Sequence, residues 1–243
     1  MADCEGLMTE LDGQIAIVTG AGRGIGEAIA KRLGKMGALV VLVARDAACL
    51  DQVKLKIRDS GGHAEAHSLD LLDPSAISAF ANAIKDRHRR CDILVNNAGI
   101  GILGKPLYET TTEDWDTVMG TNLRAPYLLI RALAPLMIAA GRGHIVNISS
   151  LAGHNPLKNG ATYAASKWGL NGLTYSVAEE LRDYGVRVSA VAPGSVNTDF
   201  GSRSKDGNWK IQPDDVANIV AMLVTQSPQS FVSEVLVRPA RKP

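Results

Sequence analysis

The chain has 243 residues, of which 46% are hydrophobic and 21% are charged. This composition is typical of a globular protein and too apolar for a disordered one, and the length is sufficient for a sizeable core. Lysine and arginine number 26 against 25 acidic residues, so the formal net charge is +1. No basic excess or basic block indicates a nucleic-acid-binding protein.

No apolar run in the sequence is long enough to predict a membrane-spanning helix. Residues 1–10 lack the basic and apolar regions of a secretory signal. The three cysteines, Cys4, Cys49 and Cys91, are scattered and show no spacing typical of a disulfide framework. We therefore expect a protein of a reducing, cytoplasmic compartment.

Short β-branched runs alternate with longer segments of helical periodicity. The expected strands are Ile15–Thr19, Leu39–Val43, a weaker run at His63–Leu69, Ile93–Asn96, His144–Ser149, Val186–Ala192 and Glu234–Val237. The expected helices are Gly24–Met36, Ala47–Ser60, Pro74–Arg89, Thr112–Ala140, Tyr163–Tyr184 and Pro213–Thr225. This alternation predicts a doubly wound α/β fold, with a parallel sheet of about seven strands and helices on both faces. No linker interrupts it, so we expect a loose N-terminal extension, residues 1–11, followed by a single domain, residues 12–243.

The first expected strand leads directly into a glycine-rich turn, Thr19–Gly26, and a helical segment follows. Glycine lets the backbone approach a ligand closely, and the start of a helix offers free N–H groups to a pyrophosphate. The spacing T-G-x-x-x-G-x-G differs from G-x-G-x-x-G, and the absence of G-K-[S/T] argues against a P-loop. The turn therefore predicts a dinucleotide site, with a turn that binds no ligand as the alternative. The cofactor-binding residues expected in it are Gly20, Gly22, Arg23, Gly24, Ile25 and Gly26.

The end of the second expected strand should lie beside the adenosine ribose of a dinucleotide. A protein that selects NAD usually has a carboxylate there, but this chain has Ala44 followed by Arg45. A guanidinium binds a 2′-phosphate bidentately, and Arg23 adds a second positive charge. The pattern favours NADP over NAD, unless Arg45 is only a solvated loop charge. Asp46 leaves a further alternative open, because it could neutralise Arg45 or bind the ribose itself.

A second group of residues indicates acid–base chemistry. Tyr163 and Lys167 are spaced i and i+4 in an expected helix, so they share one face. An ammonium near a phenol favours the phenolate, so we expect the pKa of Tyr163 to fall below about 10 and the residue to act as a general acid–base. Ser150 follows an expected strand, at the sheet edge where such folds bind ligands, and its hydroxyl could hold a substrate oxygen. On its own, the Tyr–Lys pair could also be an ordinary helix face.

With these residues the sequence resembles the short-chain dehydrogenase/reductase family, from about Leu11 to Arg238. The further motifs that carry the resemblance are Asp70-Leu71, Asn96-Asn97-Ala98-Gly99, Asn122, and Pro193-Gly194 followed by Thr198. The resemblance implies a Rossmann-type fold and hydride transfer from NADPH to a ketone carbonyl. In this reaction Tyr163 would protonate the oxygen, and Ser150 would stabilise the developing oxyanion. The general pattern is most similar to 3-oxoacyl-acyl-carrier-protein reductases and related small carbonyl reductases.

The resemblance also implies roles for individual residues. Lys167 would bind the nicotinamide ribose, and Asn122 would complete the catalytic set by holding a water in a proton relay. The expected adenosine contacts are Asp70, the Leu71 backbone, Asn97, Ala98 and Gly99, and those nearer the nicotinamide are Pro193, Gly194, Val196 and Thr198. Three of these residues have structural alternatives: Asp70 could start a turn, Asn122 could mark a helix kink, and Thr198 could cap a helix.

Two rival functions remain open: an NAD(P)-dependent alcohol or sugar dehydrogenase working oxidatively, and a non-catalytic dinucleotide sensor or scaffold. A scaffold would be expected to lack Ser150, Tyr163 or Lys167. The alternating His63, Glu65 and His67 predict a polar strand face rather than a metal site.

The expected partners are a small carbonyl substrate and further copies of the chain, in a homodimer or homotetramer built on the two longest helices. An acyl carrier protein is only weakly supported, because Arg142 and Arg182 do not match the docking arginines of relatives by spacing. Neither a nucleic acid nor a membrane is expected. The short segment Asp199–Ile211, where relatives often have a longer lid, predicts an open substrate pocket.

Overall fold

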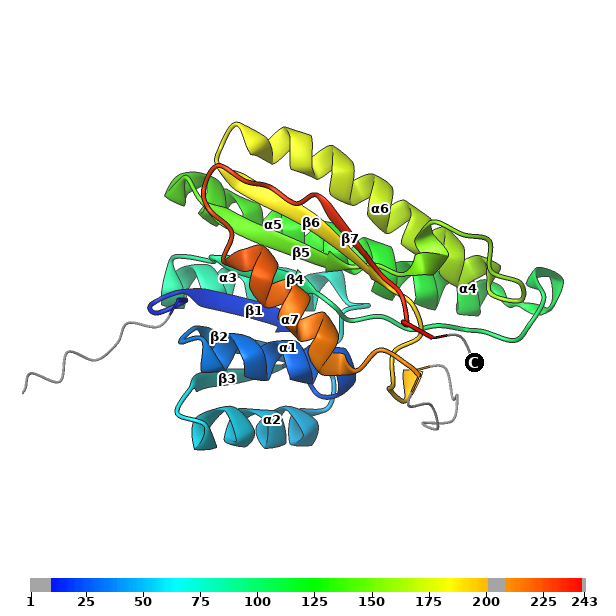
Figure 1. Cartoon of the computed structure of the whole chain (residues 1–243), viewed down its shortest axis with the longest axis horizontal. Coiled ribbons are helices and arrows are strands. Elements are labelled where there is room, and N and C mark those ends of the chain that lie inside the picture. Colours follow the sequence, from blue (N-terminus) through cyan, green and yellow to red (C-terminus); the bar gives the residue numbers. More distant parts are fainter. Residues whose placement is uncertain (1–9, 201–208, 242–243) are drawn as a thin grey trace, which may run out of the picture.

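The computed structural model describes residues 10–200 and 209–241 of the chain. Within these residues, seven strands form one parallel sheet in the order β3-β2-β1-β4-β5-β6-β7 (Figure 1). The expected doubly wound sheet is therefore confirmed. The strands are β1 (Ile15–Thr19), β2 (Leu39–Ala44), β3 (His63–Ser68), β4 (Ile93–Asn96), β5 (Gly143–Ile148), β6 (Val186–Pro193) and β7 (Glu234–Val237).

Helices follow the strands along the chain, as the alternating pattern predicts. The longer ones are α1 (Gly24–Lys35), α2 (Ala47–Asp59), α3 (Pro74–His88), α4 (Thr112–Met119), α5 (Ala125–Ala140), α6 (Ala161–Arg182) and α7 (Pro213–Val224). Single turns occur at η1 (Leu107–Glu109), η2 (Gly120–Arg124) and η3 (Leu151–Gly153).

Alternate side chains of each strand enter two separate cores. On β1, Ala16 and Val18 pack with α1, α2 and α7, whereas Ile15 and Ile17 pack with α3, α5 and α6 on the other face. Figure 1 shows these two helical layers on either side of the sheet. Burial on both faces explains why β2 and β6 are apolar along almost their whole length.

The expected helix Thr112–Ala140 is continuous, but it contains the π-turn η2 between α4 and α5. Among residues 10–200 and 209–241, it is the one helix long and apolar enough to cross a membrane, with a mean hydropathy of 1.4 over its most apolar 18 residues. In the structure α5 packs against α3 and β5, and Leu129, Leu133 and Met137 are buried in the core. Its apolar composition is therefore explained by its position in the core of the α/β sandwich.

Leu11 corrects the expected boundary of the N-terminal extension. Its side chain is 1% exposed, and its N–H donates a 2.9 Å hydrogen bond to the carbonyl oxygen of Met36. Leu11 belongs to the folded domain because its apolar side chain packs in the core that α1 covers. The expected loose packing of residues 1–9 concerns positions outside the described part of the chain.

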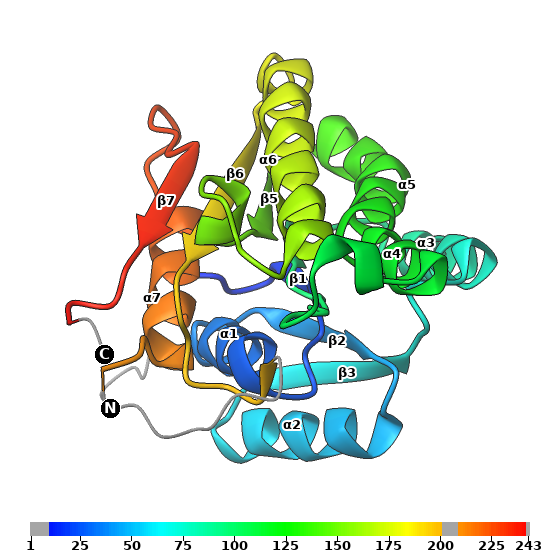
Figure 2. The ribbon, with the colours of Figure 1, turned by 90° about the vertical axis from the view of Figure 1, so that its right-hand side faces the viewer.

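All strands of the sheet are parallel, so their carboxyl ends meet at one edge. The neighbours β1 and β4 are separated in sequence by β2 and β3, which extend the sheet the other way. Such a reversal of strand order leaves a crevice at the carboxyl edge, where open α/β sheets bind ligands. Figure 2 views the molecule from this side.

Candidate active site

The glycine turn lies between β1 and α1, at the crevice. Gly24 has a φ of +58°, which favours glycine, and a Cβ added to Gly26 would collide with the carbonyl oxygen of Gly20. Arg23 is the N-cap of α1, and its side chain does not cap the helix. The first N–H groups of α1 are therefore available to a phosphate at the place the sequence predicts.

The segment after β4 forms the other side of the crevice. The Thr19 hydroxyl oxygen accepts hydrogen bonds of 3.0 Å from the N–H groups of Asn97 and Ala98. The side-chain amide of Asn97 donates to the carbonyl oxygen of Thr19 at 2.9 Å. These bonds place Asn97 and Ala98 beside the glycine turn, and contacts of Asn97, Ala98 and Gly99 with an adenosine stay a prediction.

The segment after β6 reaches the same place. Pro193 is the last residue of β6, and Gly194 and Val196 continue along the carboxyl edge. The methyl group of Thr198 lies 3.2 Å from the position of a Cβ added to Gly24, so this segment and the glycine turn are in contact. Thr198 is therefore brought to the glycine turn, while contacts of Pro193, Gly194 and Val196 with a cofactor stay a prediction.

The end of β2 carries the residues that were predicted to choose between NAD and NADP. Ala44 ends the strand, and Arg45 is exposed directly after it. Asp46 caps α2, because its carboxylate accepts a 3.1 Å hydrogen bond from the Cys49 N–H. This hydrogen bond also lowers the pKa of Asp46. Asp46 also raises the pKa of the Cys49 thiol, and the nearby Arg23 guanidinium opposes this rise. Arg23 and Arg45 thus both lie near the start of α2, while the carboxylate of Asp46 is engaged by the helix.

Asp70 lies in the exposed turn after β3. Its Oδ1 accepts a 2.9 Å hydrogen bond from the Leu72 N–H, and Leu71 beside it is buried. The turn-forming alternative for Asp70 is therefore what the structure shows. Contacts of Asp70 and Leu71 with an adenine stay a prediction.

Ser150, Tyr163 and Lys167 come together at the end of β5. The side chains of Tyr163 and Lys167 are buried in α6, which begins at Ala161 rather than at Tyr163. The Lys167 ammonium donates a 2.8 Å hydrogen bond to the carbonyl oxygen of Ile148 and lies 5.8 Å from the centre of the Tyr163 ring. Ser150 is the N-cap of η3, where its hydroxyl oxygen accepts a 3.1 Å bond from the Ala152 N–H and interacts with the Tyr163 phenol.

The expected fall in the pKa of Tyr163 is wrong for this structure. Burial disfavours the phenolate and raises the pKa, and the hydrogen bond with Ser150 offsets only part of this rise. The Lys167 ammonium is engaged by Ile148, and burial lowers its own pKa to about 8. The expectation failed because it considered the neighbouring charge without the burial of the phenol.

Asn122 lies in the π-turn η2 and is fully buried. Its Oδ1 accepts a 2.8 Å hydrogen bond from the Ile100 N–H, and its Nδ2 donates to the Ile100 carbonyl oxygen at 2.9 Å and to the Ser166 hydroxyl at 3.0 Å. A Cβ added to Gly99 would lie 3.4 Å from this Oδ1 and 3.7 Å from the Lys167 ammonium. Asn122 and Lys167 are therefore neighbours across Gly99, but the Asn122 side chain is occupied by backbone and Ser166 partners.

An apolar wall beside Tyr163 was not predicted from the sequence. It consists of Leu103, Leu157 and Phe200. The rings of Phe200 and Tyr163 have centres 5.6 Å apart, and a Cβ added to Gly101 would lie only 2.9 Å from the Phe200 ring. In the sequence, the signal for this wall was the presence of apolar residues in the loops next to the recognised motifs. The expected open pocket over Asp199–Ile211 concerns residues 201–208, which lie outside the described ranges.

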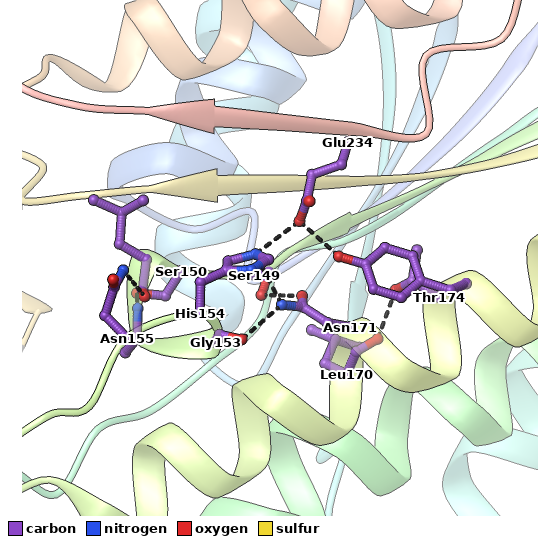
Figure 3. A network of polar contacts seen from close by, with 12 residues as sticks. Ser149, Ser150, Gly153, His154, Asn155, Leu170, Asn171, Thr174 and Glu234 are labelled. Atoms are coloured by element: carbon purple, nitrogen blue, oxygen red, sulfur yellow. Dashed lines mark hydrogen bonds and ion pairs between the residues drawn. The ribbon is translucent and has the colours of Figure 1, made fainter.

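Asn171 is a further residue of the site that the sequence analysis missed. It lies at i+4 from Lys167, as Lys167 lies at i+4 from Tyr163, so one stripe of α6 carries all three. Extending the Tyr–Lys spacing by one further step would have found it. Figure 3 shows Asn171 within a network of polar contacts around Ser149 and Ser150.

The polar face expected on β3 is also present. The Glu65 carboxylate forms a 2.7 Å ion pair with Arg87. It also lies 3.2 Å from His88 and 3.8 Å from His67. Among residues 10–200 and 209–241, no group of three histidine, cysteine or acidic side chains is arranged to hold a metal ion.

Comparison with known proteins identifies the family. Residues 14–209 match the sequence profile of the short chain dehydrogenases. The chain belongs to this family. This short-chain dehydrogenase is thus an oxidoreductase of the class that interconverts CH–OH and C=O groups.

Three similar proteins illustrate the range of the family. A solved metagenomic short-chain oxidoreductase in complex with NADP is 56% identical, with a TM-score of 0.87 over 96% of this chain and 100% of its own. The 3-oxoacyl-[acyl-carrier-protein] reductase of Synechocystis sp. is 35% identical over 93% of this chain and 95% of its own length. The alcohol dehydrogenase of the archaeon Thermococcus sibiricus, complexed with 5-hydroxy-NADP, is 27% identical, with a TM-score of 0.88 over 95% of this chain and 98% of its own.

Proposed function

We propose that this short-chain dehydrogenase reduces ketone carbonyl groups with NADPH. One observation carries the proposal: Ser150, Tyr163 and Lys167 converge at the end of β5, next to the crevice between β1 and β4. A hydroxyl, a phenol and an ammonium in this arrangement can hold a carbonyl oxygen and deliver a proton to it.

The residues around the crevice fit a dinucleotide. The close approach of Gly26 to Gly20 and the uncapped start of α1 leave room and N–H donors for the pyrophosphate. Arg23 and Arg45 would bind a 2′-phosphate, and Ala44 places no carboxylate against it. The NADP bound to the metagenomic relative supports this choice. The remaining contacts would come from Gly22, Gly24, Ile25, Asp70, Leu71, Asn97, Ala98, Gly99, Tyr163, Lys167, Pro193, Gly194, Val196 and Thr198.

NADPH bound in the crevice would supply the hydride for the carbonyl carbon. Tyr163 donates a proton to the carbonyl oxygen, and its raised pKa keeps the phenol protonated for this step. Ser150 donates a hydrogen bond to the same oxygen as negative charge develops there. Lys167 lies close enough to the Tyr163 ring to stabilise the phenolate left after proton transfer. Because the Asn122 side chain is occupied, its backbone carbonyl in the π-turn is the group that would hold a relay water.

The proposed substrates are medium-sized ketones of the 3-oxoacyl type, presented free rather than on a carrier protein. The apolar wall offers a surface for an uncharged chain or ring beside the reacting carbonyl. Arg142 precedes β5, about 20 Å from the carboxyl end of that strand. Arg182 ends α6, roughly 28 Å along the helix from Tyr163. Both arginines therefore lie well away from the site of their own chain, which argues against a carrier protein that is steered by them.

The two rival functions are separated from ketone reduction in different ways. Alcohol oxidation would use the same residues in reverse, so the choice of substrate and cofactor in the assay decides between the two directions. A non-catalytic sensor would not need Ser150, Tyr163 and Lys167 in contact. We further propose a cytoplasmic homodimer or homotetramer, since Cys49 and Cys91 are free thiols and exposed Tyr127 and Trp168 lie on α5 and α6.

The decisive experiment incubates the purified protein with a panel of β-keto esters, β-keto thioesters and simple ketones. The consumption of NADPH and of NADH is followed by absorbance, and the product alcohol is identified. Reduction of several ketones with NADPH supports the proposal. Failure with all of them, together with rapid oxidation of alcohols or sugars, would replace it with the oxidative rival.

A further inference from the structure

We propose that Asn171, His154 and Glu234 act as a positioning network that holds the Ser150 hydroxyl in place for catalysis. The network connects the turn after β5 to α6 and to the C-terminal strand β7 (Figure 3). The inference rests on the proposed role of Ser150 in carbonyl reduction.

Asn171 holds the chain on both sides of Ser150. Its Oδ1 accepts a 2.6 Å hydrogen bond from the Ser149 hydroxyl, and its Nδ2 donates to the Gly153 carbonyl oxygen at 3.1 Å. The side chain is 3% exposed, so neither partner would be compensated readily by water. Since Asn171 lies on the stripe of α6 that carries Tyr163 and Lys167, it fixes Ser150 relative to the proton donor.

Glu234 on β7 holds the far end of the same turn. His154 follows η3 directly, and its Nε2 lies 2.7 Å from Oε1 of Glu234. The same oxygen accepts a 2.9 Å hydrogen bond from the Tyr175 hydroxyl of α6. The side chains of His154 and Glu234 are 25% and 20% exposed, so this contact is screened less than one in open solvent.

The orientation of these groups follows from their chemistry. A carboxylate only accepts hydrogen bonds, so Nε2 of His154 carries its hydrogen towards Glu234. Nδ2 of Asn171 lies 3.0 Å from the same Nε2, and this approach is then a close contact between two donors. The hydrogen bond that Asn171 gives to the turn is therefore the one to Gly153.

External contacts matter here because the turn itself is small. Its internal bonds are 2.9 Å from the Gly153 N–H to the Ser150 carbonyl oxygen and 3.1 Å from the His154 N–H to the Leu151 carbonyl oxygen. A single 3₁₀ turn has poor hydrogen-bond geometry and is not stable alone. Asn171 and the contact between His154 and Glu234 therefore hold the turn in place, and with it the Ser150 hydroxyl, which the Ala152 N–H orients within the turn.

The test compares Glu234→Ala and Glu234→Gln with wild type and with Glu179→Gln as a matched control. Glu179 also forms an ion pair, with Arg182, but it lies at the far end of α6. Amide hydrogen exchange of residues 151–155 measures the opening of the turn, and steady-state kinetics measure kcat and the KM for NADPH. Asn171→Asp, which replaces the donor to Gly153 by an acceptor of the same size, is measured where it folds.

We expect Glu234→Ala to accelerate exchange in the turn about tenfold and to lower kcat by a similar factor, with the KM for NADPH unchanged. Glu234→Gln, which keeps an acceptor for His154, should lie between Glu234→Ala and wild type. Glu179→Gln should match wild type. In a Ser150→Ala background, Glu234→Ala should cause no further loss of the residual kcat, because both changes act on the same hydroxyl.

Unchanged exchange in the turn of Glu234→Ala overturns the proposal. Faster exchange with an unchanged kcat also overturns it, since the network would then be structural only. A further loss of kcat when Glu234→Ala is added to Ser150→Ala also overturns the proposal, since the two changes would then act independently. The exchange measurement does not depend on turnover, so a failure of the proposed ketone reduction is recognised separately.

Discussion

The ammonium of Lys167 donates a 2.8 Å hydrogen bond to the backbone carbonyl oxygen of Ile148, two residues before Ser150. This bond joins α6 directly to the end of β5, so the helix that carries Tyr163 and the strand that leads to Ser150 are held together. Burial lowers the pKa of Lys167 to about 8, which still leaves it mostly charged at neutral pH. The positive charge needed beside Tyr163 is thus retained inside the protein.

Replacement of Tyr163 by phenylalanine should abolish reduction and leave cofactor binding largely intact, because the other expected cofactor contacts remain. The change removes the transferable proton while the ring, and its contact with Phe200, remain. We expect kcat to fall about 10³-fold, within the range typical of general acid catalysis. NADPH affinity, measured by tryptophan fluorescence, should change less than about twofold, as for the control Tyr127→Phe on α5. Turnover close to wild type would contradict the assignment.

The double change Ala44→Asp and Arg45→Ala should move the cofactor preference from NADPH towards NADH. It adds an acceptor for the ribose 2′-hydroxyl and removes a partner of the 2′-phosphate. We expect the ratio of kcat/KM for the two cofactors to change roughly 100-fold, which is about 2.7 kcal/mol. Arg32→Ala, at the opposite end of α1, is the control and should leave the ratio unchanged. A wild-type protein that already prefers NADH would show that Arg23 and Arg45 are ordinary surface charges.

Gly101→Ala should displace the Phe200 ring and weaken binding of ketones with apolar substituents. A Cβ at this position would lie 2.9 Å from two ring carbons, closer than van der Waals contact allows. We expect the KM of an aromatic ketone to rise about fivefold, or roughly 1 kcal/mol, with little change for the smallest ketone tested. In a Phe200→Ala background the effect of Gly101→Ala should largely disappear. Equal effects with and without the Phe200 ring would show that the wall is not the cause.

His144 should make the protein less stable as the pH falls below about 6.5. It is buried on β5, where burial, and secondly the charge of Arg187, lower its pKa to about 3. Between these two values the unfolded chain binds a proton that the folded protein does not, so stability rises with pH there and is complete above pH 6.5. The loss on acidification should approach about 1.4 kcal/mol per pH unit.

Urea unfolding at several pH values tests this assignment. His144→Asn keeps a donor for the Ser189 hydroxyl, which lies 2.8 Å from the imidazole. This variant should lose less stability between pH 6.5 and 5 than wild type does, by about 2 kcal/mol. His63→Asn, at an exposed position, should keep the wild-type slope. Identical slopes for wild type and His144→Asn would assign the acid sensitivity to other groups.

A free β-keto thioester and the same acyl group on a carrier protein should be reduced with similar kcat/KM. The carrier is acidic, and Arg142 and Arg182 lie away from the carboxyl edge of the sheet. We expect less than about a fivefold advantage for the carrier at low salt, because steering needs a basic surface near the site. A large gain in kcat/KM on the carrier that disappears at moderate salt would show that a basic docking surface exists. The carrier protein would then be a partner of this enzyme.

Local patterns were sufficient to predict the sheet and its helices. Strands such as β2 are continuous apolar runs, and Pro74 and Pro213 mark helix starts, so these elements can be identified without knowing their partners. The positions of the glycine turn and of Tyr163 and Lys167 were predictable for the same reason. Their spacing along the chain already specifies their placement on one turn or one helix face.

The features that could not be predicted depend on contacts between segments that are distant in the sequence. Glu234 contacts His154, which lies 80 residues away in the sequence. Asn122 contacts Ile100 from within a π-turn, which the apolar periodicity does not reveal. Burial of the Tyr163 phenol, which reversed the expected direction of its pKa, is likewise a property of the packed fold. The core position of Leu11 was missed because a single apolar residue carries no periodicity.

The π-turn at Gly120–Arg124 has a consequence for the length of the chain. It accommodates one residue more than the α-helical turn it replaces, and each residue rotates a helix by about 100°. Deleting Thr121 would restore a regular helix and turn α4 by that angle relative to α5. Either Asn122 would leave Ile100, or Leu129 and Leu133 would leave the core. At this point the protein should tolerate substitutions far better than the loss of a single codon.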